Sequence, residues 1–152
     1  MTLQLQSAVL REELIPAAGR WVRDREAGEW VREAALEALG RSRSEAAQEE
    51  LARLWRDGEK DLSEGVRRRV LELLHAGRRL EDSRTQLLLG VLRDSGASEM
   101  DRDQAAYSLA LGAALQEELE QRLLATLGEG EARARFLKRL RQIRASVGPR
   151  GT

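Results

Sequence analysis

The stretch EWVREAALEALG, residues 29–40, decides the fold. Its apolar residues recur three and four positions apart, so on a helix they form a single stripe along one side. Most of that stripe is alanine, whose small side chain allows a neighbouring helix to approach closely. Gly40 ends the stretch, and glycine readily adopts the left-handed conformation that terminates many helices. The sequence therefore predicts an amphipathic helix with a close neighbour, its stripe formed by Val31, Ala34, Ala35, Ala38 and Leu39.

The order of residues in this stretch resembles the second helix of a HEAT repeat, the helix-pair unit of α-solenoids. The resemblance rests on Arg32, the pair Ala34-Ala35 and the closing Leu39-Gly40. It implies a stack of antiparallel helix pairs that binds a partner along a concave surface lined by the second helices.

The composition favours an all-α protein. Leu, Ala, Glu and Arg, which are strong helix formers, dominate the 152 residues, and only two prolines interrupt them. The 26 basic residues balance the 26 acidic ones, so no overall field draws the chain to nucleic acid or to a membrane surface. Any electrostatic attraction must therefore come from local patches.

The residues that the chain lacks narrow the function classes. There is no cysteine, which excludes disulfides, thiolate catalysis and cysteine-ligated metal. The apolar runs are too short to span a bilayer, and the N-terminus does not read as a secretory signal, so we expect a cytoplasmic protein without a membrane segment. The absence of Asn and Cys is a thermophile tendency, which GC-rich codon usage would also produce.

The stripe repeats along the chain. Val66 follows Val31 by 35 residues, and Leu74 follows Leu39 by the same interval, which is a plausible length for a helix-pair repeat. We expect a short α-solenoid of four antiparallel helix pairs that share one core, or alternatively a compact helical bundle. A single domain over residues 1–147 and a flexible tail over residues 148–152 follow from this. The pairs are predicted near residues 2–41, 44–77, 82–112 and 116–146.

Local signals place the helix boundaries. Pro16 lacks a backbone N–H, so a kink or break is expected near residues 14–16. Serine is a favoured N-cap residue, and it precedes three of the expected helices at Ser44, Ser63 and Ser98. Helix ends are predicted at glycine-containing breaks, namely Asp57-Gly58, Gly77, Asp94–Gly96, Leu111-Gly112 and Gly128.

The functional prediction is a non-enzymatic scaffold for protein–protein interaction. By the resemblance, a partner would bind the concave surface that the second helices line, where Arg and aromatic side chains are the favoured contact residues. The candidate partner-binding residues are Trp30, Arg32, Arg67, Arg68, Arg102, Tyr107, Arg135 and Arg139.

A nucleic-acid-binding module is the first alternative. Residues 129–150 hold seven basic and two acidic side chains, and Arg67, Arg68 and Arg69 form a second basic run. The same arginines could instead keep a terminal helix face in solvent. An enzyme resembling the HEAT-like DNA glycosylases would need a Trp beside an Asp in a basic groove, and the sequence places no such pair.

The remaining predictions concern single residues. His75 is expected in the last turn of its helix, on a face with Arg68 and Glu72, and neither a catalytic group, a cofactor nor a metal site is predicted there. Trp55 is expected in the core. Trp30 begins its helix, and two alternatives stay open for it: a half-exposed contact residue, or burial between the first two pairs. A homodimer through the N-terminal helix stays open, with Leu3, Leu5, Val9 and Leu10 as its surface.

Overall fold

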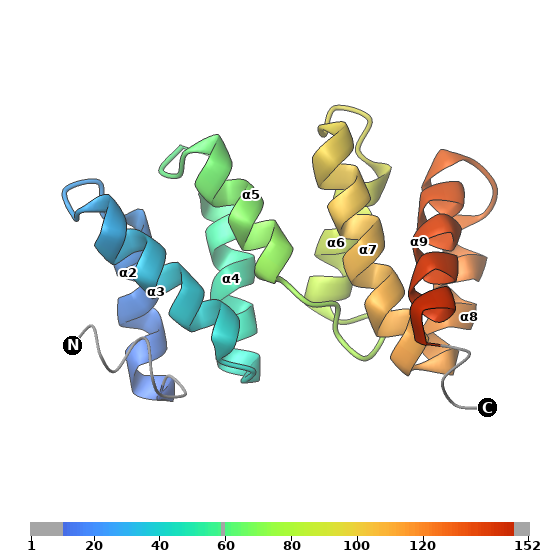
Figure 1. The fold of residues 1–152 in the computed structure, drawn as a ribbon, viewed down its shortest axis with the longest axis horizontal. Coiled ribbons are helices and arrows are strands. Elements are labelled where there is room, and N and C mark those ends of the chain that lie inside the picture. Colours follow the sequence, from blue (N-terminus) through green and yellow to red (C-terminus); the bar gives the residue numbers. More distant parts are fainter. Residues whose placement is uncertain (1–10, 59, 148–152) are drawn as a thin grey trace. The chain divides into compact units, whose positions relative to one another are not determined.

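A computed structural model describes residues 11–58 and 60–147, and these residues form helices and connecting loops without a β-strand. The predicted all-α class is confirmed. The predicted N-terminal dimer surface lies outside the described residues. The elements are η1, a 3-10 helix (Glu12–Leu14), and the α-helices α2 (Ile15–Arg23), α3 (Glu29–Arg41), α4 (Glu45–Asp57), α5 (Glu64–Leu73), α6 (Ser83–Arg93), α7 (Glu99–Leu115), α8 (Glu117–Leu127) and α9 (Glu131–Val147) (Figure 1).

The contacts divide the chain into two compact units, the first ending at Leu74 and the second beginning at His75. Each unit contains two helix pairs, so α2, α4, α6 and α8 are called first helices below, and α3, α5, α7 and α9 are called second helices. A single domain over residues 1–147 stays a prediction.

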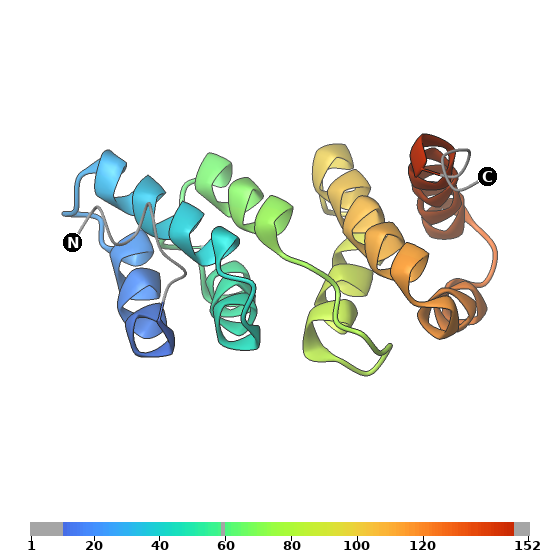
Figure 2. The ribbon, with the colours of Figure 1, turned by 60° about the horizontal axis from the view of Figure 1, so that its bottom comes forward.

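In unit 1 the two pairs pack as two layers. Helix α2 packs against α3 and α4, while α5 packs against α4 and lies beside α3. The first helices therefore form one layer and the second helices the other (Figures 1 and 2). An ion pair of 3.7 Å between Arg23 and Asp57 joins the C-terminal ends of the first helices.

Unit 2 is organised around one long helix. Helix α7 packs against α6, α8 and α9, and it lies beside α9 as the second-helix neighbour (Figure 2). The C-terminal ends of the two first helices are again joined, because the Arg93 guanidinium donates a hydrogen bond to the Thr126 carbonyl.

Leucine and alanine fill both cores. In unit 1 the predicted stripe is buried at Ala35, Ala38 and Leu39, while Val31 and Ala34 are half-buried. Leu36, which the stripe did not include, is buried as well. Trp55 is buried as predicted. In unit 2 the largest fully buried side chain is Phe136.

The predicted helix starts are confirmed. The hydroxyls of Ser44, Ser63 and Ser98 each accept a hydrogen bond from the backbone N–H three residues later, at 3.2, 3.3 and 3.1 Å. These bonds satisfy an N–H group that has no partner within its own helix. The predicted break near Pro16 is also present, because η1 ends at Leu14 and Pro16 lies in the first turn of α2, where its missing N–H removes no helical bond.

Three of the predicted helix ends are wrong. Helix α3 continues past Gly40 to Arg41, and α7 continues past Gly112 to Leu115. Helix α5 ends at Leu73, four residues before Gly77, and the buried Gln48 side chain donates a hydrogen bond of 3.2 Å to the Leu73 carbonyl.

Gly40 serves packing rather than termination. A Cβ atom at this position would lie 2.5 Å from Cδ2 of Leu73, so glycine allows α5 to approach α3. The predicted end at Gly128 is confirmed, because its φ of 63° is in the left-handed region that favours glycine.

Candidate binding surfaces

The second helices carry all eight of the predicted partner-binding residues. Each unit holds four of them. They lie on α3 (Trp30, Arg32), α5 (Arg67, Arg68), α7 (Arg102, Tyr107) and α9 (Arg135, Arg139).

Two of the predicted arginines hold a helix pair together. Arg32 of α3 donates from Nε to the Val22 carbonyl at 2.9 Å. Arg67 of α5 donates from Nε and a terminal nitrogen to the Trp55 carbonyl at 3.4 and 3.3 Å, and its guanidinium lies 3.9 Å from the centroid of the Trp55 ring. Both carbonyls belong to the last turn of a first helix, where no intrahelical donor is available. These arginines are therefore structural residues within their pairs.

Unit 2 contains the same contact at a residue that the sequence analysis did not single out. Arg133 of α9 donates to the carbonyl of Leu124, in the last turn of α8, at 2.9 Å. Arg32 and Arg67 stand three residues after the glutamate that begins their helix, whereas Arg133 stands two residues after Glu131. Arg102 has the three-residue spacing but pairs with carboxylates instead.

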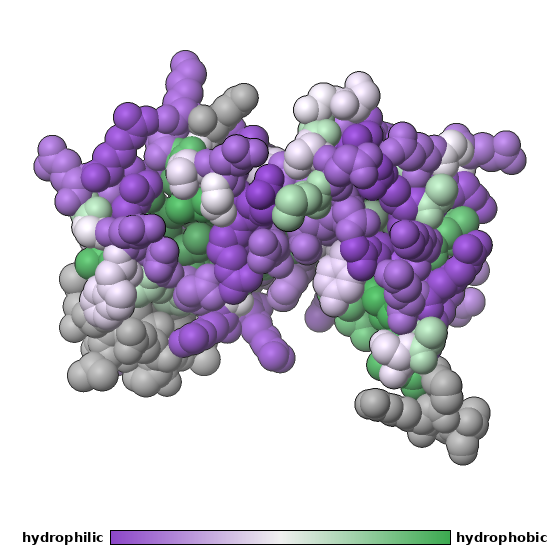
Figure 3. Space-filling model, turned by 45° about the horizontal axis from the view of Figure 1, so that its top comes forward, coloured by the Kyte–Doolittle hydropathy of each residue, from purple (hydrophilic) through white to green (hydrophobic). Residues whose placement is uncertain are grey.

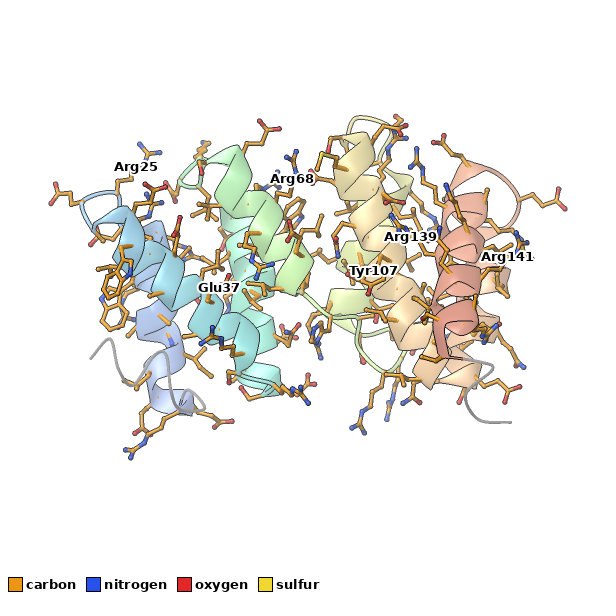
Figure 4. All side chains as sticks on the ribbon, in the orientation of Figure 1. Arg25, Glu37, Arg68, Tyr107, Arg139 and Arg141 are labelled. Carbon is orange, nitrogen blue, oxygen red and sulfur yellow. The ribbon has the colours of Figure 1, made fainter. Side chains whose placement is uncertain are left out.

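A bidentate ion pair connects the second helices of unit 1. Arg69 of α5 donates to both carboxylate oxygens of Glu37 of α3, at 2.8 and 2.6 Å, and to Glu72 at 2.9 Å. The hydrogen bond from Arg69 holds the pKa of Glu37 below its ordinary value, and the pKa of Arg69 is raised in turn. Figure 4 shows Glu37 on α3, on the side of that helix that meets α5.

The other residues predicted near this pair lie elsewhere. Arg68 forms an ion pair of 3.5 Å with Glu64 along its own helix. His75 is exposed and follows the end of α5, so the predicted helix face shared by Arg68, Glu72 and His75 is wrong. The helix ends where Leu74 adopts an extended backbone conformation, and its last carbonyls accept hydrogen bonds from the Gln48 side chain and the Leu74 N–H.

Unit 2 has an equivalent ion pair between its second helices. Arg139 of α9 donates to both carboxylate oxygens of Asp103 of α7, with Nε at 3.1 Å, and it lies 5.9 Å from the centroid of the Tyr107 ring. The bond from Arg139 holds the pKa of Asp103 below its ordinary value. In Figure 4, Arg139 occupies the space between α7 and α9, whereas Arg141 lies on the outer side of α9.

A second network lies one turn nearer to the start of α7. Arg135 lies 2.8 Å from Glu99 and 2.7 Å from Glu131, and Arg102 lies 3.5 and 3.6 Å from the same two carboxylates. Arg144 forms an ion pair with Glu120 of α8. The excess positive charge read from residues 129–150 is thus largely balanced by carboxylates from neighbouring helices.

Two grooves accompany the cross-helix pairs. The α3–α5 groove has a volume of about 400 Å³ and is lined by Glu29, Glu33, Leu36, Glu37, Ser63, Gly65, Val66 and Arg69. The α7–α9 groove has a volume of about 340 Å³ and is lined by Glu99, Met100, Asp103, Arg135, Lys138, Arg139 and Gln142. The first groove contains three carboxylates and one cation, and the second contains two carboxylates and three cations.

The large apolar side chains that are exposed in the described residues are confined to the second helices. Figure 3 shows a mostly hydrophilic face with smaller hydrophobic areas in each unit. Among the described residues, six large apolar side chains are exposed, and every one lies on a second helix. They are Trp30 on α3, Met100, Tyr107, Leu111 and Leu115 on α7, and Val147 on α9.

Of the two alternatives for Trp30, burial between the first two pairs is wrong, because 58% of its surface is exposed. Trp30 occupies the first turn of α3, directly after the loop that follows α2, where the packed part of the helix has not yet begun. Its exposure makes it a candidate contact residue.

Within the described residues, no three His, Cys, Asp or Glu side chains are grouped so that they could hold a metal ion. No helix there is both long enough and apolar enough to cross a bilayer. Comparison with family models, with curated proteins and with solved structures found no match to the chain.

Proposed function

We propose that the protein is a non-enzymatic, HEAT-like interaction scaffold that binds a protein partner through the outward faces of its second helices. One observation carries this proposal: the exposed large apolar side chains of the described residues all lie on second helices. Trp, Tyr and Met are enriched in protein interfaces, and such side chains remain uncovered at a cost unless a partner buries them.

The repeated spacing supports the solenoid part of the proposal. Helices α3, α5 and α7 begin at Glu29, Glu64 and Glu99, with 35 residues between successive starts. Each unit also joins its second helices by an arginine–carboxylate pair and its first helices at their C-terminal ends. A repeated helix-pair unit accounts for this pattern more directly than an irregular bundle does.

The nucleic-acid alternative would depend on Lys138 and Arg141, which are exposed. Neither forms an ion pair with a carboxylate in the part of the chain that the structure describes, whereas Arg135, Arg139 and Arg144 do. Within residues 129–147 few cations are thus left to neutralise phosphates, which disfavours a phosphate site on this helix. The glycosylase-like alternative is disfavoured as well, because it requires an exposed Trp in a basic groove. The exposed Trp30 follows Glu29, and Glu29 lines the α3–α5 groove, which contains three carboxylates and one cation.

Site-specific photocrosslinking tests the proposal. A benzophenone amino acid replaces Tyr107 on α7 in one variant and Gln121, an exposed residue of the first helix α8, in the control. We expect a crosslinked protein band from position 107 and none from position 121. Equal crosslinking from both positions would contradict the proposal, and a product that nuclease removes would favour the nucleic-acid alternative.

A further inference from the structure

The outward face of α7 carries a stripe of apolar side chains that none of the described residues covers. Met100, Tyr107, Leu111 and Leu115 are exposed, and spacings of seven and four residues place them on one side of the helix. At 1.5 Å of rise per residue the stripe is about 22 Å long, which is the length of a four-turn helix. Met100 and Tyr107 have 62% and 38% of their surfaces exposed.

This face is also depleted of charge. Residues 104–116 contain no charged side chain, in a chain of which 34% of the residues are charged. A surface helix of an isolated domain normally carries charges on its outward side, while the core of a protein interface loses them and gains Tyr and Met. The face of α7 therefore has the composition of an interface core.

The edge of the stripe beside α9 is positively charged. Met100 and Lys138 line the same groove, and the carboxylate of Asp103 in that groove is already bonded to Arg139. Lys138 is exposed and lies within 4 Å of no described carboxylate oxygen. An occupant of the stripe would therefore be favoured if the edge that it presents to α9 were acidic.

We propose that the α7 face binds an amphipathic helix of the partner protein, with its apolar side on Met100, Tyr107 and Leu111 and its acidic edge against Lys138. This inference rests on the proposed function and names the chemistry of its partner. The α3–α5 groove, which contains Glu29 and Glu33, repels the same acidic edge, so the charge pattern directs the partner to unit 2.

The test uses two 18-residue helical peptides with the same leucine face and with either Glu or Lys along one edge. Tyr107 is the only tyrosine of the chain, so protein labelled with 3-fluorotyrosine gives one ¹⁹F signal, which reports directly on the proposed face. We expect the Glu peptide to shift this signal at micromolar concentration, and the Lys peptide to bind about fivefold more weakly, as one surface charge pair allows.

Three variants assign the effect. Lys138→Glu should reverse the preference between the two peptides, because it changes the charge of the edge and leaves the stripe intact. Leu111→Ser should weaken the binding of both peptides equally, because it changes the apolar stripe and not the charge of its edge. Arg43→Glu, an exposed residue of unit 1, is the matched charge control and should change neither affinity. Circular dichroism of each variant verifies that it is folded.

The inference is overturned if neither peptide shifts the signal, if both bind equally, or if Lys138→Glu leaves the preference unchanged. It is also overturned if the signal shifts with protein concentration alone, since a second copy would then occupy the face. If one of these results is obtained and position 107 still crosslinks to a protein, the proposed function is retained and only the acidic helical partner is rejected.

Discussion

The α3–α5 and α7–α9 grooves have the same construction and opposite charge. In each groove an arginine of the later helix bonds a carboxylate of the earlier one, as Arg69–Glu37 in unit 1 and Arg139–Asp103 in unit 2. The neighbouring positions differ, because Glu29 and Glu33 line the first groove and Arg135 and Lys138 line the second. The comparison separates residues that hold helices together, such as Arg69, Arg139 and Arg135, from Lys138, which forms no ion pair with a described carboxylate.

The largest effect should come from the core of unit 2. Phe136→Ala should lower the free energy of unfolding by about 3–5 kcal/mol, because it removes a fully buried ring and leaves a cavity. Denaturation followed by far-UV circular dichroism measures this loss.

The same variant tests whether the two units unfold separately. All three tryptophans, Trp21, Trp30 and Trp55, belong to unit 1, so their fluorescence follows that unit alone. We expect the fluorescence midpoint to shift less than the circular dichroism midpoint. Coincident midpoints would instead support one cooperative domain over residues 1–147.

A smaller loss of stability should distinguish Arg67 from Arg133, which each bond a carbonyl in the last turn of a first helix. Arg67→Ala removes hydrogen bonds to the Trp55 carbonyl and the contact with its ring, so a loss of about 1–2 kcal/mol is expected. Arg133→Ala removes a single bond to a carbonyl and should cost about 1 kcal/mol or less. Urea denaturation of both variants compares the costs, and an equal loss would mean that the ring contact contributes nothing measurable.

The smallest effect is the pH dependence of the cross-helix pairs. Bonds from arginine lower the pKa of Glu37 and Asp103 in the folded protein below their ordinary values of 4.5 and 3.8. The unfolded chain therefore binds more protons in this range, so the pairs stabilise the fold at neutral pH and lose that contribution as the pH falls below about 4.5 and through the lowered values.

The double variant Glu37→Gln with Asp103→Asn measures this contribution. We expect the free energy of unfolding of the wild type to exceed that of the variant by about 1 kcal/mol or less at pH 7, since both pairs are partly exposed. The difference should be smaller at pH 3. Glu129→Gln, which changes an exposed carboxylate, is the control. A stability difference that stayed constant between pH 7 and pH 3 would contradict the assignment to these carboxylates.

The sequence was sufficient for features that depend on local chemistry. Serine before a helical stripe predicted three N-caps, because the capping bond spans only three residues. The ends at Gly40 and Gly77 were predicted wrongly for a tertiary reason. Leu73 approaches Gly40 from the adjacent pair, and Gln48 reaches the end of α5 from α4.

The candidate residues were predicted on the correct helices but without their partners. Arg139 is bonded to a carboxylate 36 residues away, and Arg69 is bonded to one 32 residues away. The 3.6-residue period of a helix does not predict contacts over such intervals. Reading the chain at its repeat length would have indicated that such intervals join neighbouring second helices. The exposure of Trp30 could not be predicted without the tertiary packing, because the sequence of the first turn does not show at which residue the helix becomes buried.

The constant 35-residue interval between the starts of α3, α5 and α7 also affects how the chain can change in length. A duplication or deletion of one 35-residue segment would keep the initial glutamate, and the arginine three positions later, in step with the helices that follow. Arg32 and Arg67 each bond the last turn of the first helix of their own pair, so a segment that contains a whole pair carries this contact with it. Growth by whole segments is therefore the route by which descendants of this protein could acquire a longer binding face without redesigning the contacts already present.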